Sequence, residues 1–173
     1  MFDKYMKPDY ILDTFADVTP EFCRKNSITA LICDIDNTLV TYDDPEPTES
    51  VMSWYRALGE IGVKLSFVSN NDEARVMRFA KPLGVPAFYK SGKPSRRGIR
   101  MAVEAMGSDP STTVFLGDQL LTDVMAAKRY GIRAIVVPPI KDKTTLFFRA
   151  KRAIERPFMN KYIKQGVKKN DKT

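Results

Sequence analysis

Histidine is absent from the 173 residues of this sequence. Its absence excludes Ser-His-Asp triads, imidazole general bases and zinc sites with histidine ligands. Any chemistry must therefore depend on carboxylates, hydroxyls, amides or lysine. Cysteine is nearly absent as well. Cys23 and Cys33 show no metal-site spacing, so we expect reduced thiols in the core.

Long apolar runs are also missing. No stretch approaches the roughly 20 apolar residues that a membrane-spanning helix requires. Charged residues interrupt the N-terminal segment, which is unlike a secretory signal, so a cytoplasmic protein is expected. The chain contains 43% hydrophobic residues, which is ample for a single core.

The net charge of +7 is concentrated at the C-terminus. Residues 1–140 carry 17 basic and 18 acidic side chains, whereas residues 141–173 carry 11 basic and 3 acidic ones. We therefore divide the chain into a core domain, 1–140, and a basic C-terminal helix and tail, 141–173. The end of the tail, Lys168–Thr173, has the composition of a disordered segment. Attraction to an acidic surface should come first from this tail.

Short apolar segments alternate with segments of helical periodicity. The apolar segments suit parallel strands that are covered on both faces. They are residues 30–33, 64–68, 113–116 and 134–137, with a shorter one at 86–89. The helical segments lie at about 49–59, 73–83, 95–106 and 121–130. This alternation predicts an α/β fold, a doubly wound parallel sheet with helices on both faces.

Two carboxylates follow the first apolar segment, in Asp34-Ile35-Asp36-Asn37-Thr38. Because side chains alternate along an extended chain, Asp34 and Asp36 would face the same side. This spacing suits a carboxylate that attacks phosphorus and an acid that protonates the leaving oxygen, with a metal ion to screen the charge. The alternative is a strand that ends in a turn, which Asp and Asn favour by themselves.

Three later segments could complete such a site. Ser69-Asn70-Asn71 offers a hydroxyl and two amides to phosphate oxygens, or only a helix cap. Lys93, in a Gly-Lys-Pro sequence, could neutralise a transferring phosphoryl group, although most lysines are simply solvated. Asp118 and Asp123, in GDQLLTD, could face one Mg²⁺ ion, which prefers oxygen ligands. The alternative is that Asp118 caps a helix and that Asp123 lies in this helix by chance.

In order and type, these four segments resemble the four motifs of the haloacid dehalogenase superfamily of phosphohydrolases. The details DIDNTLV, VSNN, GKP and GDQLLTDV look closest to the YqeG family of subclass IIIA phosphatases, which is related to the mitochondrial phosphatidylglycerophosphate phosphatases. The resemblance covers residues 8–140. It implies a Rossmann-like core and a phosphatase that depends on Mg²⁺.

The resemblance also implies catalytic roles. Asp34 would be the nucleophile that becomes an aspartyl phosphate, and it would also bind Mg²⁺. Asp36 would be the general acid and base, and its backbone carbonyl would bind the metal. Lys93 would stabilise charge during catalysis and contact the substrate.

The remaining matched residues would bind the substrate or the metal ion. Ser69 would hold the phosphate, with the amide of Asn70 as a further substrate contact. Asp118 would complete the metal site, and Asp123 would bind the metal directly or support it from nearby.

The spacing between motifs leaves no room for a sizeable cap domain. Only 32 residues separate Asp36 from Ser69, and 23 separate Ser69 from Lys93. The predicted helices use most of both intervals. The resulting open site resembles those of family members that act on large substrates or are closed by oligomerisation, and the oligomeric state stays open. Residues 42–47 are expected to form a short flap loop.

The basic C-terminal segment mixes aromatic, aliphatic and basic residues. Such a stretch could lie on the anionic inner face of a membrane, where each nearby charge contributes about 1 kcal/mol. It could equally pack on the sheet as a helix with a solvated basic face. Arg96, Arg97 and Arg100, after the third motif, raise a similar choice between a phosphate or polyanion contact and solvated surface.

Three functions remain open from the sequence. The preferred one is an Mg²⁺-dependent phosphomonoesterase that acts on phosphatidylglycerophosphate or another large substrate. The second keeps this chemistry for nucleic-acid ends or soluble sugar phosphates, although no groove-reading or stacking element supports nucleic acid. The third is a scaffold without catalysis, which the intact set of motif residues argues against.

Overall fold

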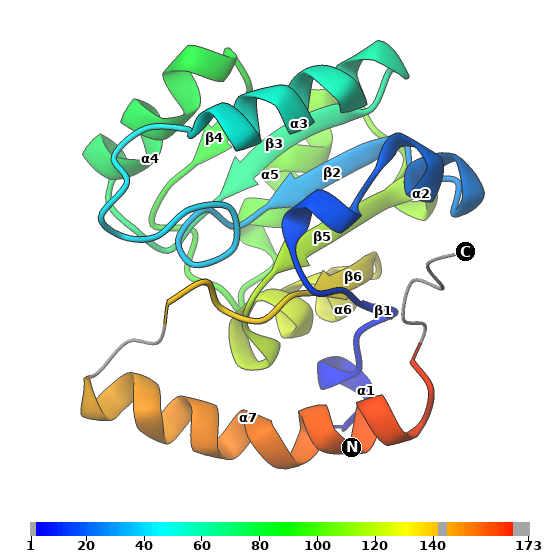
Figure 1. The fold of residues 1–173 in the computed structure, drawn as a ribbon, viewed down its shortest axis with the longest axis vertical. Coiled ribbons are helices and arrows are strands. Elements are labelled where there is room, and N and C mark those ends of the chain that lie inside the picture. Colours follow the sequence, from blue (N-terminus) through cyan, green and yellow to red (C-terminus); the bar gives the residue numbers. More distant parts are fainter. Residues whose placement is uncertain (1–2, 142–144, 168–173) are drawn as a thin grey trace.

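The computed structural model describes residues 3–141 and 145–167. A six-stranded parallel sheet lies at its centre, in the order β1-β6-β5-β2-β3-β4 (Figure 1). The strands are β1 (Tyr10–Ile11), β2 (Ala30–Cys33), β3 (Lys64–Val68), β4 (Ala87–Phe88), β5 (Thr113–Gly117) and β6 (Arg133–Val136). The predicted α/β fold with a doubly wound parallel sheet is confirmed.

The order of the strands reverses direction between β2 and β5. From β2 the sheet grows through β3 to β4, and from β5 it grows through β6 to β1 on the other side. Cys33 lies opposite Leu116 in the register, so Asp34 and Asp118 leave the sheet close together. In open α/β sheets, ligands bind in the crevice that such a reversal leaves at the carboxyl ends of the strands.

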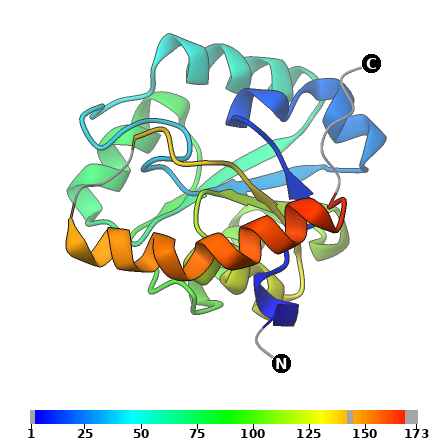
Figure 2. The same ribbon diagram turned by 60° about the horizontal axis from the view of Figure 1, so that its bottom comes forward.

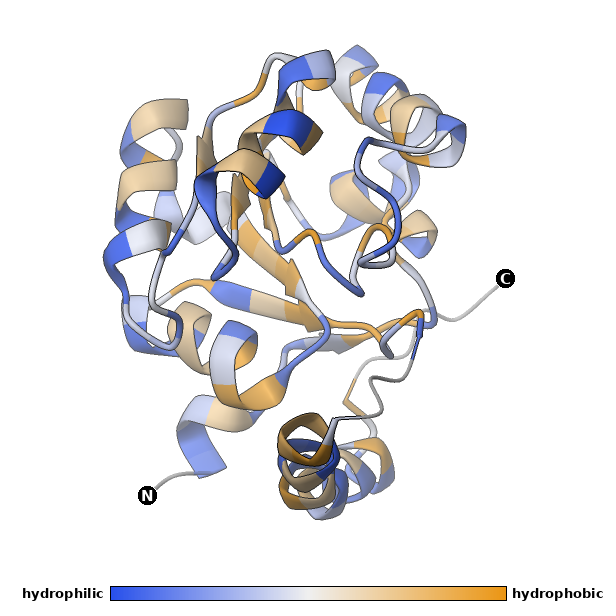
Figure 3. Cartoon of the chain, turned by 90° about the vertical axis from the view of Figure 1, so that its left-hand side faces the viewer, coloured by the Kyte–Doolittle hydropathy of each residue, from blue (hydrophilic) through white to orange (hydrophobic). Residues whose placement is uncertain are grey.

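Helices cover both faces of the sheet. One core contains α2 (Pro20–Lys25), α3 (Glu49–Glu60) and α4 (Glu73–Ala80), and the other contains α1 (Asp3–Met6), α5 (Arg97–Met106) and α6 (Met125–Tyr130). Successive residues of β2 alternate between these cores: Leu31 and Cys33 face the first, Ala30 and Ile32 the second. Because both faces are buried, the strands are mainly hydrophobic, as Figure 3 shows for the centre of the molecule.

The helix ends differ in detail from the prediction. The helix expected at 73–83 continues beyond α4 as a 3-10 turn, η2 (Lys81–Leu83), and the one expected at 121–130 begins with a π-helical turn, η4 (Leu120–Val124). Short 3-10 turns, η1 (Phe15–Asp17) and η3 (Pro110–Thr112), precede α2 and β5. The sequence pattern does not reveal β1, α1 or α2, because this strand of two residues and these helices of four and six residues carry no readable periodicity. No inserted cap domain is present among the described residues.

The basic C-terminal segment forms a long helix, α7 (Leu146–Lys164), which lies outside the sheet layers (Figures 1 and 2). Tyr162 anchors its C-terminal half: the ring is fully buried, and its hydroxyl donates to Asp3 Oδ1 at 2.6 Å. Within the described ranges, no helix combines the length and apolarity needed to cross a bilayer. The disorder predicted for Lys168–Thr173 lies outside the described residues.

We expect Tyr162→Ala to release α7 while the sheet stays folded. Removal of a buried aromatic side chain costs about 3–5 kcal/mol, and among the described residues the hydroxyl of Tyr162 bonds only to Asp3 of α1. Hydrogen exchange should become faster in α7 and stay unchanged in β2 and β5. Ile163→Ala removes the neighbouring side chain, which is 45% exposed, and should change neither. Global unfolding of Tyr162→Ala would contradict this local docking.

Candidate active site

The carboxyl ends of β2, β3 and β5 surround a cavity of about 450 Å³. Six of the seven predicted site residues line it: Asp34, Asp36, Ser69, Asn70, Lys93 and Asp123. The seventh, Asp118, offers a carboxylate oxygen within 4.8 Å of those of Asp34 and Asp123. The fold therefore brings together residues that lie up to 89 positions apart in the sequence.

The turn after β2 orients the first motif. Asn37 has a left-handed backbone, with φ of 62°, which asparagine tolerates better than most residues. Its amide donates to Val40 O at 2.7 Å, so the chain folds back at once. Asp34 and Asp36 remain on the cavity side of this turn, 6% and 5% exposed.

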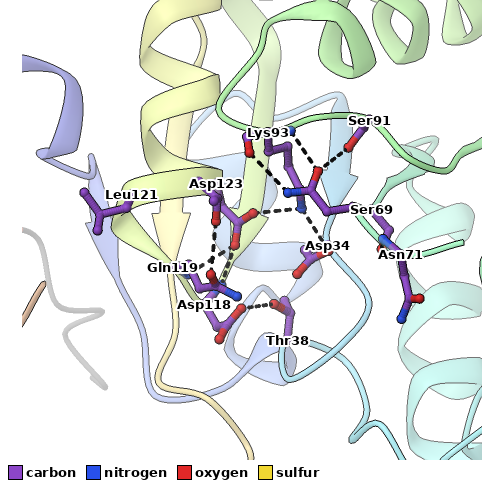
Figure 4. Close-up of polar contacts among 12 residues, drawn as sticks. Asp34, Thr38, Ser69, Asn71, Ser91, Lys93, Asp118, Gln119, Leu121 and Asp123 are labelled. Atoms are coloured by element: carbon purple, nitrogen blue, oxygen red, sulfur yellow. Dashed lines mark hydrogen bonds and ion pairs between the residues drawn. The ribbon is translucent and has the colours of Figure 1, made fainter. Parts of the chain in front are cut away.

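Lys93 extends between two carboxylates (Figure 4). Its Nζ lies 2.9 Å from Asp34 Oδ1 and 2.8 Å from Asp123 Oδ1. Burial by itself would lower the pKa of Lys93, but the charges of Asp123 and Asp34 outweigh burial and raise it. The ammonium group therefore stays charged inside the cavity.

The second motif supports the loop that carries Lys93. Asn70 Oδ1 accepts hydrogen bonds from Lys93 N at 2.7 Å and Ser91 Oγ at 3.0 Å, and its Nδ2 donates to Lys93 O at 3.1 Å. Both ends of this amide thus hold the loop, and its contact with substrate stays a prediction. Ser69 Oγ accepts from Asn71 N at 3.1 Å, and among the described residues its own proton has no acceptor.

The fourth motif is held by a close approach between backbone and side chain. Asp123 Oδ2 accepts from Asp118 N at 3.2 Å and from Gln119 N at 3.1 Å. A Cβ on Gly117 would lie 2.4 Å from Asp123 Oδ2 and 2.5 Å from its Cβ, so this position accepts only glycine. The π-helical turn η4 then places Asp123 below Lys93 and beside Asp118 (Figure 4).

Asp34, Asp118 and Asp123 fit a divalent cation. All three are buried, and each has a carboxylate oxygen within 4.8 Å of an oxygen of the other two. Asp123 Oδ1 forms an ion pair with Lys93 and, among the described residues, accepts no further hydrogen bond, so it retains capacity to bind a cation. The three carboxylates face two cations, Lys93 and Arg152. An all-oxygen donor set with excess negative charge suits a hard ion such as Mg²⁺.

The close packing of these buried carboxylates also shifts their pKa values. Burial raises the pKa of Asp34 to about 7, with Lys93 opposing the rise. Burial and then the neighbouring charges of Asp123 and Asp34 raise the pKa of Asp118 to about 8, with Arg152 opposing. The folded protein thus holds carboxyl groups whose ionised forms are unfavourable without a further cation.

Helix α7 contributes residues to the site that the sequence motifs do not include. Phe147, Phe148 and Lys151 line the cavity. Arg152 donates to Asp118 Oδ2 at 2.6 Å and Asp118 O at 3.0 Å. The sequence holds one signal for this docking: Glu155 is the single acid of a basic helix, and it is 3% exposed where it accepts from Leu121 N.

Comparison with known proteins gives a consistent result. A family model described as haloacid dehalogenase-like hydrolase matches residues 10–131. "Probable phosphatase YqeG" of Bacillus subtilis (strain 168) is 36% identical over 166 residues, which cover 96% of each chain.

Solved structures are similar in fold. An uncharacterized protein from Listeria monocytogenes serotype 4b has a TM-score of 0.54 at 20% identity, over 68% of this chain and 85% of that one. A structure titled putative 3-deoxy-D-manno-octulosonate 8-phosphate phosphatase, from Vibrio cholerae, also has a TM-score of 0.54, at 15% identity over 76% and 75% of the two chains. At these identities the likeness concerns the fold alone.

Without metal ions, we expect stability to fall as the pH rises. The pKa values of Asp34 and Asp118 are raised from an ordinary 3.8 to about 7 and about 8. Between the ordinary value and the raised values, the folded state therefore binds more protons than the unfolded state. The free energy of unfolding is therefore greatest near the ordinary pKa and falls as the pH rises toward the raised pKa values. Calorimetry in EDTA should give a lower Tm at pH 8 than at pH 5.

Asp118→Asn should flatten this dependence, because it removes one of the two shifted groups. Asp109→Asn is the matched control. Asp109 is exposed, and hydrogen bonds from Ser111 lower its pKa, so its replacement should leave the slope unchanged. A wild-type Tm that increases over this interval would contradict the assignment.

Proposed function

The chain belongs to the haloacid dehalogenase-like hydrolases and is a phosphatase, and from this premise we propose that it hydrolyses phosphomonoesters with Mg²⁺ through an aspartyl phosphate on Asp34. The observation that carries the proposal is the position of Lys93 Nζ, 2.9 Å from Asp34 and 2.8 Å from Asp123. A nucleophilic carboxylate must be ionised. Burial opposes ionisation of Asp34, and Lys93 favours it.

In the first step an oxygen of Asp34 forms a bond to phosphorus while the bond from phosphorus to the ester oxygen breaks. Asp36 gives its proton to that leaving oxygen. In the second step Asp36, now ionised, takes a proton from water, whose oxygen forms a bond to phosphorus as the bond to Asp34 breaks. The products are an alcohol and inorganic phosphate, and both aspartates return to their initial states.

Other side chains stabilise charge without reacting. The ammonium group of Lys93 faces the position of the transferring phosphoryl group. The free hydroxyl proton of Ser69 is available to a phosphate oxygen. Mg²⁺, held by Asp34, Asp118 and Asp123, would supply Lewis-acid screening of the phosphoryl charge.

We propose further that the substrate is presented by an anionic membrane surface. On α7, Leu146, Phe147 and Ile154 are 83%, 72% and 56% exposed. Arg149 and Arg156, also exposed, lie seven residues apart on the same helix, so a basic stripe accompanies the apolar one. This combination suits a helix that lies on acidic phospholipids.

The position of Phe147 connects this surface to the chemistry. Phe147 belongs to the exposed stripe and also lines the cavity. A membrane in contact with α7 would therefore lie beside the mouth of the cavity. Phosphomonoester headgroups such as that of phosphatidylglycerophosphate are the substrates that this arrangement favours.

One observation supports a second candidate substrate class. Arg96, Arg97, Arg100 and Arg129 line a pocket of about 700 Å³ beside the Lys93 loop. Within residues 3–141 and 145–167, none of the four forms an ion pair with a carboxylate. Arginine recognises phosphate well, so phosphorylated ends of nucleic acids are the alternative.

We expect Mg²⁺-dependent phosphate release that EDTA abolishes and that Asp34→Asn reduces by roughly 1,000-fold or more, since the nucleophile is lost. The matched control is Asp43→Asn, a flap carboxylate that is 74% exposed and paired with Lys141, and it should keep full activity. The substrates compared are phosphatidylglycerophosphate, sugar phosphates and 3′- or 5′-phosphorylated oligonucleotides. Unchanged activity in Asp34→Asn would overturn the mechanism, and release from none of the substrates would favour a scaffold.

We expect the protein to co-sediment with anionic vesicles and not with neutral ones. Each basic side chain near the surface contributes about 1 kcal/mol, so the double variant Arg149→Gln/Arg156→Gln should bind roughly 30-fold more weakly. Arg24→Gln/Arg56→Gln neutralises two exposed arginines on α2 and α3 and should bind like the wild type. Equal binding to both kinds of vesicle would rule out the membrane proposal.

A further inference from the structure

Arg75 is an almost buried arginine in the first turn of α4, with a side chain only 14% exposed. Its Nε and Nη2 both donate to Asp36 Oδ1, at 3.1 and 2.9 Å. Nη2 also donates to Thr41 O at 3.2 Å, and Nη1 donates to Asp44 O. All three guanidinium nitrogens are therefore engaged, one side on Asp36 and the other on the loop that follows the first motif.

Asp36 is also held from its second oxygen. Asn71 Nδ2 donates to Asp36 Oδ2 at 2.9 Å, and Asn71 Oδ1 accepts from Asp72 N at 2.8 Å, which fixes the amide. Opposite sides of the carboxylate are thus held by Asn71 and Arg75. A group that transfers protons needs this kind of fixed orientation, because small displacements from the reacting atoms reduce the rate strongly.

The loop that Arg75 holds closes part of the cavity. Asp44 Oδ2 accepts from Thr41 N at 2.9 Å and Thr41 Oγ1 at 2.7 Å, which closes a turn. Tyr42, inside this turn, lines the cavity. One guanidinium group therefore fixes both Asp36 and the turn 41–44 of the flap.

We propose that Arg75 is a positioning residue that aligns Asp36 for proton transfer and couples this alignment to closure of the flap 42–47. The proposal rests on the proposed function, in which Asp36 is the general acid and base. Within the described part of the chain, Arg75 is not among the residues that line the cavity, and its hydrogen bonds go to Asp36, Thr41 and Asp44 and not to Asp34. Its effect passes through Asp36 and through Tyr42.

Arg78 provides a matched control on the same helix. It also holds the flap, because its Nε and Nη2 lie 3.2 and 3.1 Å from Glu46 Oε1. It does not contact Asp36, and its side chain is 61% exposed. Such surface pairs contribute little, about 0–1 kcal/mol, so Arg78→Ala should have almost no effect.

The kinetic test compares two leaving groups. An alkyl phosphate requires a proton from Asp36 as its alkoxide leaves, whereas p-nitrophenyl phosphate releases a stable anion and needs little help. Arg75→Ala should lower kcat/KM about 100-fold for the alkyl phosphate, because general acid catalysis contributes at least this much, and only a few-fold for p-nitrophenyl phosphate. The ratio kcat/KM reports the steps up to departure of the alcohol, whereas kcat also includes the second step, in which Asp36 acts as the base for both substrates. Arg75→Lys keeps the positive charge but loses the planar guanidinium group with its several donors. Its activity on the alkyl phosphate should therefore lie between those of the wild type and Arg75→Ala.

A double-variant cycle tests whether the effect of Arg75 on the rate acts through Asp36. In the Asp36→Asn background, Arg75→Ala should cause no further difference between the two substrates. Equal losses of kcat/KM for both substrates in Arg75→Ala would show that Arg75 has a merely structural role and would overturn the proposal. Where Arg75→Ala does not fold, Arg75→Lys supports the same comparison.

A second measurement does not depend on turnover. Hydrogen exchange at the Thr41 amide, which is bonded to Asp44 Oδ2, should become faster in Arg75→Ala and stay as in the wild type in Arg78→Ala. An unchanged exchange rate of the Thr41 amide in Arg75→Ala would overturn the coupling to the flap. If the wild-type protein releases no phosphate from any substrate, the proposed function fails, and this exchange measurement still decides the coupling.

Discussion

Mutual repulsion among buried carboxylates is the constraint on which the rest of the structure depends. Four of them, each 6% exposed or less, lie at one edge of the sheet: Asp34, Asp36, Asp118 and Asp123. A buried charge without a partner costs several kcal/mol, so cations must reach the same place. They come from three separate elements: Lys93 from a loop, Arg75 from α4 and Arg152 from α7. The remaining excess of negative charge makes the site suitable for a divalent metal ion.

The apolar core decides where these cations lie. Val76 and Phe79 bury α4 against the sheet, and the guanidinium group of Arg75 lies 5.9 Å from the ring centre of Phe79. Likewise, Tyr162 is buried in the second core and carries α7 with it. Hydrophobic packing therefore determines the charge balance of the site, and the charge balance determines which groups are ionised there.

The sequence predicts most of the fold and most of the candidate site, because both depend on local signals. Buried parallel strands are continuous apolar runs, and Asp34, Ser69 and Asp118 stand directly beyond them. Arg75 and Arg152 could not be assigned in this way. Each resembles a solvated helical arginine in the sequence, and its partner lies 39 or 34 positions away. Only the packing of α4 and α7 brings these pairs together.

These contacts also indicate which element can open the cavity. Displacing α7 would expose Tyr162, at a cost of about 3–5 kcal/mol, and would separate Arg152 from Asp118. The flap 42–47 is held by weaker contacts: the exposed pairs of Arg78 with Glu46 and of Lys141 with Asp43 each contribute at most about 1 kcal/mol. The hydrogen bonds of Arg75 to the loop are less exposed than these pairs. Opening of the flap is therefore the less costly motion. Since Arg75 also contacts Asp36, opening of the flap would release one side of the proposed general acid, and on this proposal proton transfer follows closure over the substrate.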